Sequence, residues 1–414
     1  MPENTPRSLM REATCPACGY HVAVPLFDGG AQPLATLAWP ASAEAARAMP
    51  RLPLDFVRCV DCGHVYNAAF DYAAVPYTEK PNLMFNSPPL WSVHLQTVLL
   101  EIASRLPQSP TVVEIGYGDG SFLAGLAELR PDGRYVGFDP HGTEEPDWIH
   151  VEFRRALFEP TRDFADLRPD LIISRHVLEH LSNPLGFVQQ LSFGASCVGA
   201  TPAMYIEVPC IDRALETRRT VDFFYEHNSN FTTESFTRML ARCATAIDSV
   251  QHGYDGEVVY GFARLGGQQQ QVTHAEVAVE FAASARAAEA TIRAQLEGLL
   301  LGGRRVVVWG GTGKAAAFMN RYGMDARQFP TVVDSDPLKV GTFVPGTGQE
   351  IRSRDWLLEH PVEVVIIPPQ WRAREIVAEM TRAGIQARFV LIEHEGRLVD
   401  YHRDDHPYRL RAVA

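Results

Sequence analysis

The sequence predicts an α/β protein in which two doubly wound, Rossmann-like domains follow a small cysteine-containing domain. Three observations carry this prediction. Apolar strand-like runs alternate with helical patterns, which favours parallel sheets. A strand, a glycine loop and a helix follow one another twice, and two CxxCG motifs stand in the first segment. We therefore expect domains at residues 1–95, 96–270 and 271–414.

Composition and charge limit the class of protein. The chain has 414 residues, of which 46% are hydrophobic and 21% charged, so it can form several packed cores. A net charge of −12 argues against nonspecific binding to nucleic acid or to an anionic membrane, which need basic surface. The sequence has no run of 18 apolar residues and no signal-peptide core, and its seven cysteines fit a reducing cytoplasm.

Two cysteine motifs predict a metal centre in the first domain. Cys15 and Cys18 belong to CPACG, and Cys59 and Cys62 belong to CVDCG. Four thiolates around one tetrahedral centre are typical of structural Zn²⁺, which has no open position for catalysis. Redox dithiols or two unrelated turns are the alternatives. The long separation of the motifs predicts a β-rich insertion, and we expect His64 at the surface rather than as a further ligand.

The second domain shows the strand–helix alternation most clearly. Helical patterns cover residues 95–105, 120–129 and 184–191, and the strand-like runs are TVVEI (111–115), RYVGF (134–138), LIIS (171–174) and MYIEV (204–208). Ligands of doubly wound sheets bind at the carboxyl ends of the strands. The residues that follow these four runs should therefore meet in one crevice.

A glycine loop after the first of these strands predicts a nucleoside site. Gly116, Gly118 and Gly120 let the backbone turn sharply and approach a ligand, and Asp139 follows 19 residues later at the end of the next strand. An acid at this distance binds ribose hydroxyls in parallel βαβ units. An ordinary glycine-rich turn is the alternative.

Glu114 indicates which nucleoside is bound. The spacing G-x-G-x-G differs from the G-x-G-x-x-G of dinucleotide sites, and a carboxylate before it would repel a diphosphate but suit a zwitterionic amino acid. The pattern resembles the first motif of class I S-adenosylmethionine-dependent methyltransferases. The residues that we expect to hold this cofactor are Glu114, Gly116, Tyr117, Gly118, Gly120, Asp139, Pro140, Arg175 and His176.

The third domain carries a second glycine loop. The segment GGQQQQVTHAEV marks a boundary, with Gln268–Gln271 as an exposed link before a long helix over 274–301. The loop Gly310-Gly311-Thr312-Gly313-Lys314 then opens a helix, where free backbone N–H groups and a lysine suit a phosphate or diphosphate. Asp334 ends the next strand and could face a ribose or sugar. A purely structural glycine turn is the alternative.

Acid–base groups cluster after the fourth strand. Tyr225, Glu226 and His227 follow one another, and a half-buried histidine can take up a proton near neutral pH. We expect His227 to be a base, Glu226 to fix its tautomer and Tyr225 to donate to an oxygen. His180 lies near the same crevice and is a further catalytic candidate. A histidine with a purely structural role is the more common case.

The order of these parts resembles the three-domain C-methyltransferases of antibiotic deoxysugar pathways, which act on nucleotide-linked keto-sugars. The resemblance covers nearly the whole chain and is carried by CPACG…CVDCG, EIGYGDG, SRHVLEHLSNP, EVPCI…FFYEHNSNFT and WGGTGKAAAF…VVDSDPLKVGTFVPGTG.

The resemblance implies a mechanism and a substrate. S-adenosylmethionine would occupy the central crevice, and a base near YEH would remove the proton beside the ketone, so that C3 of a 4-keto-deoxysugar is methylated through an enolate. The terminal domain would help to hold the nucleotide diphosphate, most simply of a dTDP-sugar. The residues implied for the substrate are Tyr77, Gly310, Gly311, Thr312, Gly313, Lys314 and Asp334.

The chain also departs from that family. Phe224-Tyr225-Glu226-His227 stands where the sugar enzymes commonly have Tyr-His-Glu-His, and the strand at 362–367 ends in PPQW. These departures indicate a different substrate geometry. A ketoreductase that uses NADPH, alone or combined with methylation, is an alternative, because the second strand–glycine–helix unit could bind a nicotinamide nucleotide and Tyr225 could protonate an alkoxide. A non-enzymatic zinc-linked binding protein is another. The sequence leaves the sugar, its stereochemistry and the oligomeric state open.

Overall fold

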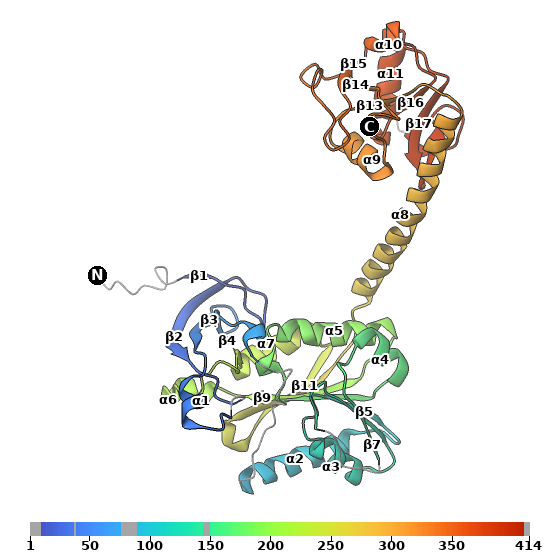
Figure 1. The fold of residues 1–414 in the computed structure, drawn as a ribbon. Helices are drawn as coiled ribbons and strands as arrows, with labels where there is room; N and C mark the ends of the chain where they lie inside the picture. The colour runs from blue at the N-terminus through green and yellow to red at the C-terminus, as the bar shows by residue number, and fades with distance from the viewer. Residues whose placement is uncertain (1–9, 37–38, 76–88, 144–149, 410–414) are drawn as a thin grey trace. The chain divides into compact units, whose positions relative to one another are not determined.

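The computed structural model describes residues 10–36, 39–75, 89–143 and 150–409. The chain forms two compact units, Met1–Thr273 and His274–Ala414, each with its own sheets (Figure 1). Among the helices of these ranges, none combines the length and the apolar character that crossing a bilayer requires.

An antiparallel sheet opens the first unit. Its strand order is β1-β2-β3-β4-β10. The strands are β1 (Arg11–Glu12), β2 (Val22–Gln32), β3 (Leu52–Cys59), β4 (Val65–Asn67) and β10 (Ser229–Asn230), with the short helix α1 (Ala43–Arg47) and the 3₁₀ turn η2 (Tyr72–Ala74) beside them. The expected β-rich insertion between the cysteine motifs is confirmed as the hairpin of β2 and β3. Since β10 comes from much later in the chain, the sheet ties the cysteine motifs to the segment around residue 230.

The prediction that His64 lies at the surface is wrong. The residue is fully buried, and its ring centroid lies 4.7 Å from that of Phe231. Burial lowers the pKa of His64 to about 3, so the ring is neutral at pH 7.

A seven-stranded sheet forms the centre of the first unit, in the order β11-β12-β9-β8-β5-β6-β7. Its strands are β5 (Thr111–Ile115), β6 (Arg134–Phe138), β7 (Val151–Arg154), β8 (Leu171–Arg175), β9 (Ala203–Pro209), β11 (Ala246–Gly253) and β12 (Val258–Arg264). Five neighbouring strands of this sheet, in the order β9, β8, β5, β6 and β7, are parallel to one another. Strand β12 is antiparallel to both of its neighbours, β9 and β11. The strand order changes direction between β5 and β8, which is where doubly wound folds bind ligands.

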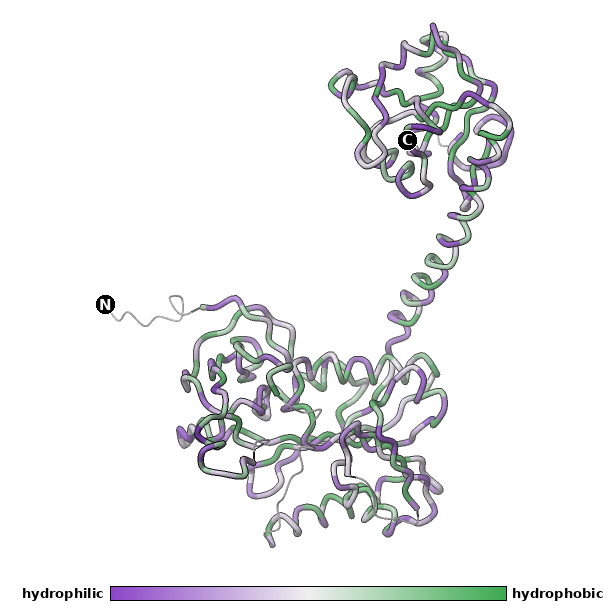
Figure 2. Tube along the Cα trace, in the orientation of Figure 1, coloured by the Kyte–Doolittle hydropathy of each residue, from purple (hydrophilic) through white to green (hydrophobic). Residues whose placement is uncertain are grey.

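Helices cover both faces of this sheet (Figure 1). On one face lie α2 (Pro89–Arg105) and α3 (Ser121–Leu129), and on the other α4 (Pro160–Leu167), α5 (Pro184–Cys197) and α7 (Thr233–Cys243). The short elements η3 (Leu178–His180), α6 (Asp212–Thr217) and η4 (Tyr254–Gly256) complete the unit. The central strands are largely green in Figure 2, as expected for strands buried on both faces. The predicted four strands and three helices are confirmed, with their ends shifted by a few residues.

The second unit contains a six-stranded sheet in the order β15-β14-β13-β16-β17-β18. Only β18 is antiparallel to its neighbour. The strands are β13 (Val306–Trp309), β14 (Val332–Asp334), β15 (Ile351–Ser353), β16 (Val364–Ile366), β17 (Phe389–His394) and β18 (Arg397–Asp400). The helices are α8 (Gln269–Leu301), α9 (Lys314–Tyr322), α10 (Trp356–Glu359) and α11 (Ala373–Ala383), with 3₁₀ turns η5 (Gln370–Arg372) and η6 (Pro407–Arg409).

The prediction of a non-helical link at Gln268–Gln271 is wrong. Residues 269–271 are exposed, as expected, but they belong to helix α8, which begins at Gln269. Glutamine is a good helix former, so the long helix extends through these polar positions. Hydrophilic and hydrophobic residues alternate along α8 (Figure 2).

Candidate active site

A cavity of about 450 Å³ opens at the carboxyl ends of β5, β6 and β8. This volume is in the range of small-molecule and cofactor pockets. Eight of the nine residues predicted to hold a cofactor line it, namely Glu114, Gly116, Tyr117, Gly118, Asp139, Pro140, Arg175 and His176. The ninth, Gly120, is not a lining residue, although its neighbours Asp119 and Ser121 are. The remaining wall includes Trp91, His141, Phe158 and His180.

The glycines of the loop are required by conformation and by space. Gly116 has φ +81°, and a Cβ there would lie 2.4 Å from Val177 Cγ2. Gly120 has φ +75°, and its Cβ would lie 2.5 Å from the ring of Phe153. Side chains at these positions would therefore force the loop or the opposite wall to move, so the backbone itself forms the cavity floor.

Asp139 is held in place by the loop that it faces. Its Oδ2 accepts a hydrogen bond from Gly118 N at 3.1 Å, and its Oδ1 accepts one from His141 N at 2.9 Å. A carboxylate has about four acceptor sites, so each oxygen can still accept a further hydrogen bond. Asp139 is therefore able to bind a diol in the cavity.

Glu114 presents a buried carboxylate without a full set of partners. The residue is 2% exposed, and its Oε2 has no hydrogen-bond partner among the described residues. Burial raises the pKa of Glu114 to about 8. A cationic amine beside it would supply both the missing donor and the missing charge. The residues present thus fit the amino-acid end and the ribose of S-adenosylmethionine.

The sequence analysis missed Glu207, which organises the cavity wall. This carboxylate is fully buried and accepts hydrogen bonds from Arg175 at 3.0 Å and His176 at 2.9 Å. His94 and the hydroxyl of Tyr205 bind its other oxygen at 2.9 and 2.6 Å. Although burial opposes ionisation, Arg175 and the two histidines hold the pKa of Glu207 well below its ordinary value. The only signal in the sequence was a lone carboxylate within an apolar strand.

Two imidazoles lie together beside the cavity. His180 lines it, and the ring centroids of His180 and His227 are 5.0 Å apart. His180 Nδ1 lies 2.8 Å from the backbone oxygen of Glu226, and since a carbonyl can only accept, Nδ1 carries the hydrogen. Burial lowers the pKa of His227 to about 3, which leaves this ring neutral at pH 7. The predicted pair of catalytic histidines is therefore brought together.

The two residues before His227 face elsewhere. Glu226 is fully buried, and its Oε1 accepts hydrogen bonds from Ala35 N at 2.8 Å and Thr36 N at 2.7 Å. Tyr225 is 1% exposed, and its hydroxyl accepts a hydrogen bond from Asp71 N at 2.8 Å. These contacts join the segment to the N-terminal sheet and do not support the expected orienting and donating roles.

The second glycine loop lies at the carboxyl end of β13, where the strand order of its sheet changes direction. Gly310 and Gly313 have positive φ values, +108° and +58°, and a Cβ on Gly311 would lie 2.2 Å from Ile351. Thr312, Gly313 and Lys314 are exposed. Lys314 Nζ lies 5.5 Å from the ring centroid of Trp371.

Asp334 anchors that loop. Its Oδ2 accepts hydrogen bonds from Gly311 N at 3.1 Å and Lys339 Nζ at 3.3 Å. The carboxylate is 9% exposed, so it contributes to the shape of the loop more than to its open face. Tyr77, the other residue expected to bind substrate, lies outside the described residues.

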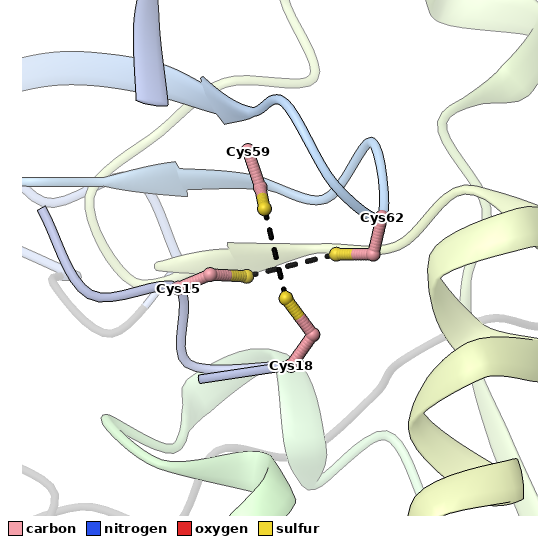
Figure 3. Close-up of side chains that lie close together, drawn as sticks. All are labelled: Cys15, Cys18, Cys59 and Cys62. Carbon is pink, nitrogen blue, oxygen red and sulfur yellow. Dashed lines mark hydrogen bonds between the residues drawn. The ribbon is translucent and has the colours of Figure 1, made fainter. Parts of the chain in front are cut away.

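The four cysteines of the N-terminal motifs converge (Figure 3). Their ligand atoms all lie within 4.8 Å of one another, with Cys15 Sγ 3.7 Å from Cys62 Sγ and Cys18 Sγ 3.6 Å from Cys59 Sγ. Four sulfurs bound to zinc at about 2.3 Å lie about 3.8 Å apart at tetrahedral angles. All four are buried, so the cluster is a closed set of soft ligands that could bind a metal.

Two family models match the chain. Residues 92–243 match a methyltransferase domain, and residues 264–392 match a C-methyltransferase C-terminal domain. Most of the residues that line the cofactor cavity lie within the part of the chain that matches the methyltransferase domain. A C-methyltransferase C-terminal domain follows it in the chain.

Individual proteins are similar over smaller regions. A tRNA (guanine-N(7)-)-methyltransferase from Hydrogenovibrio crunogenus is 35% identical over 54 residues, which is 13% of this chain and only 22% of that protein. An O-methyltransferase family protein from Burkholderia thailandensis (15% identity, TM-score 0.31) and human N-acetylserotonin methyltransferase in complex with S-adenosylmethionine (18%, 0.30) each align with 42% of this chain. The aligned parts are 57% and 52% of those two chains, so the chain spans about half their length.

Proposed function

We propose that this enzyme transfers a methyl group to the carbon beside the ketone of a nucleotide-diphosphate-linked 4-keto-deoxysugar. The observation that carries the proposal is the imidazole pair of His180, which lines the cavity, and His227, whose ring centroid lies 5.0 Å from that of His180, in a chain with a C-methyltransferase C-terminal domain. The sequence resemblance to the deoxysugar enzymes supports C3 as the methylated carbon and dTDP as the nucleotide.

Carbon methylation requires a base, because a carbon beside a ketone is nucleophilic only as an enolate. His227 is neutral at pH 7 and can take up this proton. The ring of His180 lies beside that of His227, with centroids 5.0 Å apart, and its Nδ1–H donates to the Glu226 carbonyl. When bound, S-adenosylmethionine supplies the electrophilic methyl group, and Glu114 and Asp139 hold its amino-acid and ribose ends. Holding both reactants in line contributes much of the rate.

The second unit would bind the nucleotide diphosphate. Exposed backbone at Thr312 and Gly313 opens helix α9, and Lys314 stands beside the exposed Trp371. Helix N-termini and a lysine attract phosphate oxygens. The division into residues 1–95, 96–270 and 271–414 accordingly describes three roles: a scaffold, methyl transfer and nucleotide binding.

We assign Zn²⁺ to the cysteine cluster, as a structural metal. The Sγ–Sγ distances of 3.6 and 3.7 Å support this assignment. The core that the cysteines share with Phe231 and Leu178 supports a structural role for the metal beside the catalytic segment. Ketoreduction, the alternative from sequence, gains no support from Tyr225, because its hydroxyl accepts a hydrogen bond from Asp71 N and donates one to Asp71 O.

Exchange of hydrogen with solvent tests the base. In D₂O without methyl donor, the enzyme should incorporate deuterium at the carbon beside the ketone of a dTDP-4-keto-deoxysugar, and His227→Asn should abolish this exchange. Asn retains a hydrogen-bonding side chain but cannot act as the base. Exchange that persists in His227→Asn would identify another base, and no exchange in the wild type would refute the proposed substrate class.

A further inference from the structure

A buried carboxylate, Glu179, lies among the histidines of the cavity wall and has no role in the chemistry above. It is 2% exposed on the short element η3. Its Oε1 lies 3.3 Å from His176 Nδ1, and its Oε2 has no hydrogen-bond partner among the described residues. Its carboxylate lies within 4.8 Å of ring nitrogens of both His180 and His227.

Glu179 is charged at neutral pH. Burial opposes ionisation, but the hydrogen bond with His176 and the attraction of His180, His176 and His227 lower the pKa of Glu179 below its ordinary value. A buried anion is stable only where hydrogen bonds or cations compensate for lost water. Because Oε2 of Glu179 lacks a hydrogen-bond partner, a positive charge that forms on a neighbouring imidazole would stabilise this carboxylate.

The surrounding charges come from three segments. His176 follows β8 and also binds Glu207, His180 belongs to η3, and His227 lies in the loop before β10 next to Glu226. Of the two carboxylates near His227 in sequence or space, Glu226 has its Oε1 bound by the backbone N–H groups of Ala35 and Thr36. Glu179 is the carboxylate whose oxygen lies within 4.8 Å of ring nitrogens of both His180 and His227.

We propose that Glu179 is the positioning residue of the base: its nearby negative charge favours the His227 tautomer that carries its N–H toward the carboxylate, and it stabilises the imidazolium formed on proton uptake. The inference rests on the proposed function. In the step, the substrate C–H bond breaks, its electron pair remains as the enolate and the proton forms an N–H bond on His227. Carboxylates that orient a catalytic histidine act in this way in hydrolytic triads.

A pair of variants separates charge from shape. Glu179→Gln keeps the volume but removes the charge, whereas Glu179→Asp keeps the charge and loses a methylene. Asp400→Asn is the matched control, since Asp400 is also buried with one unpaired carboxylate oxygen but lies on β18 of the second unit. Each is assayed for solvent exchange and for kcat and KM.

The expected ranking is wild type and Asp400→Asn, then Glu179→Asp, then Glu179→Gln. Glu179→Gln should lose roughly tenfold or more in exchange and kcat, part of the about 10²–10⁴-fold that general-base catalysis contributes, with KM changed less than about twofold. If Glu179→Gln is as active as wild type, or more active than Glu179→Asp, the carboxylate charge has no role and the inference is overturned.

A measurement without substrate distinguishes this inference from the proposed function. ¹⁵N-histidine NMR at pH 7.5 should show one tautomer for His227 in the wild type and in Glu179→Asp, and a changed tautomer ratio in Glu179→Gln. An unchanged ratio would overturn the orienting role even if the keto-sugar is methylated. A second metal ion that is lost from both Glu179→Gln and His227→Asn would also overturn it, because the cluster would then be a metal site.

Discussion

Gly116→Ala tests whether the glycine loop shapes the cofactor cavity. An alanine at φ +81° costs about 1–2 kcal/mol in the left-handed region. Its Cβ would also lie 2.4 Å from Val177 Cγ2, and such overpacking costs about 1–3 kcal/mol. The sum is about 2–5 kcal/mol of unfolding free energy, which at roughly 2–4 °C per kcal/mol lowers the melting temperature of the first unit by about 4–20 °C.

The affinity for the cofactor should fall together with stability, because Val177 lines the cavity and any shift of its side chain changes the cavity wall. We expect the affinity for S-adenosylmethionine to fall at least tenfold, or about 1.4 kcal/mol, by titration calorimetry. Gly199→Ala is the matched control in the same unit: its φ is +66° and a Cβ there meets nothing within 4 Å, so it should cost only the backbone contribution and leave binding intact.

A second substitution isolates the steric part. The double variant Gly116→Ala/Val177→Ala should bind S-adenosylmethionine more tightly than Gly116→Ala alone, because the smaller side chain makes room for the new Cβ. If Gly116→Ala binds as tightly as wild type and melts like Gly199→Ala, the loop does not form the cavity floor as described.

Three further predictions concern the cofactor site and the metal. Asp139→Ala should weaken S-adenosylmethionine binding by roughly 1–3 kcal/mol through lost ribose hydrogen bonds; unchanged affinity by calorimetry would remove this assignment. The pKa of Glu114 is raised to about 8, so the free enzyme carries a proton there at pH 7 that a bound ammonium should displace. Calorimetry in buffers of different ionisation enthalpy should detect this proton release, and the affinity for S-adenosylmethionine should rise with pH toward about 8. Glu114→Gln should abolish the proton release. Release that persists in this variant would show that another group loses the proton. Elemental analysis should find one zinc per chain, and Cys62→Ser should lose it and lower the melting temperature of the first unit; a metal-free wild type that melts normally would contradict the zinc assignment.

Local patterns in the sequence were enough to predict the cofactor crevice. The strand, the glycines and Asp139 lie within 30 residues, and their chemistry depends on one βαβ unit. The cysteine cluster was predictable for a similar reason, because each CxxCG motif forms its own turn and only the pairing of the two turns is long-range.

The acid–base residues show what the sequence could not provide. Neighbours in an extended segment point in different directions, so Tyr225 reaches Asp71, Glu226 reaches residues 35–36 and His227 lies beside His180. Glu207 was missed because its partners come from α2 and β8, which become neighbours only in the folded sheet. His64 was misplaced because residue 231, far along the chain, covers it.

The position of the transferred methyl group tests the central claim most directly. The wild-type enzyme is incubated with [methyl-¹³C]S-adenosylmethionine and a dTDP-4-keto-deoxysugar. NMR of the product should show that the labelled methyl carbon is bonded to the ring carbon beside the ketone, either by a one-bond ¹³C–¹³C coupling or by a long-range coupling of the methyl protons to that ring carbon. A label found on oxygen or nitrogen, or a donor that is bound but never consumed, would contradict carbon methylation through an enolate.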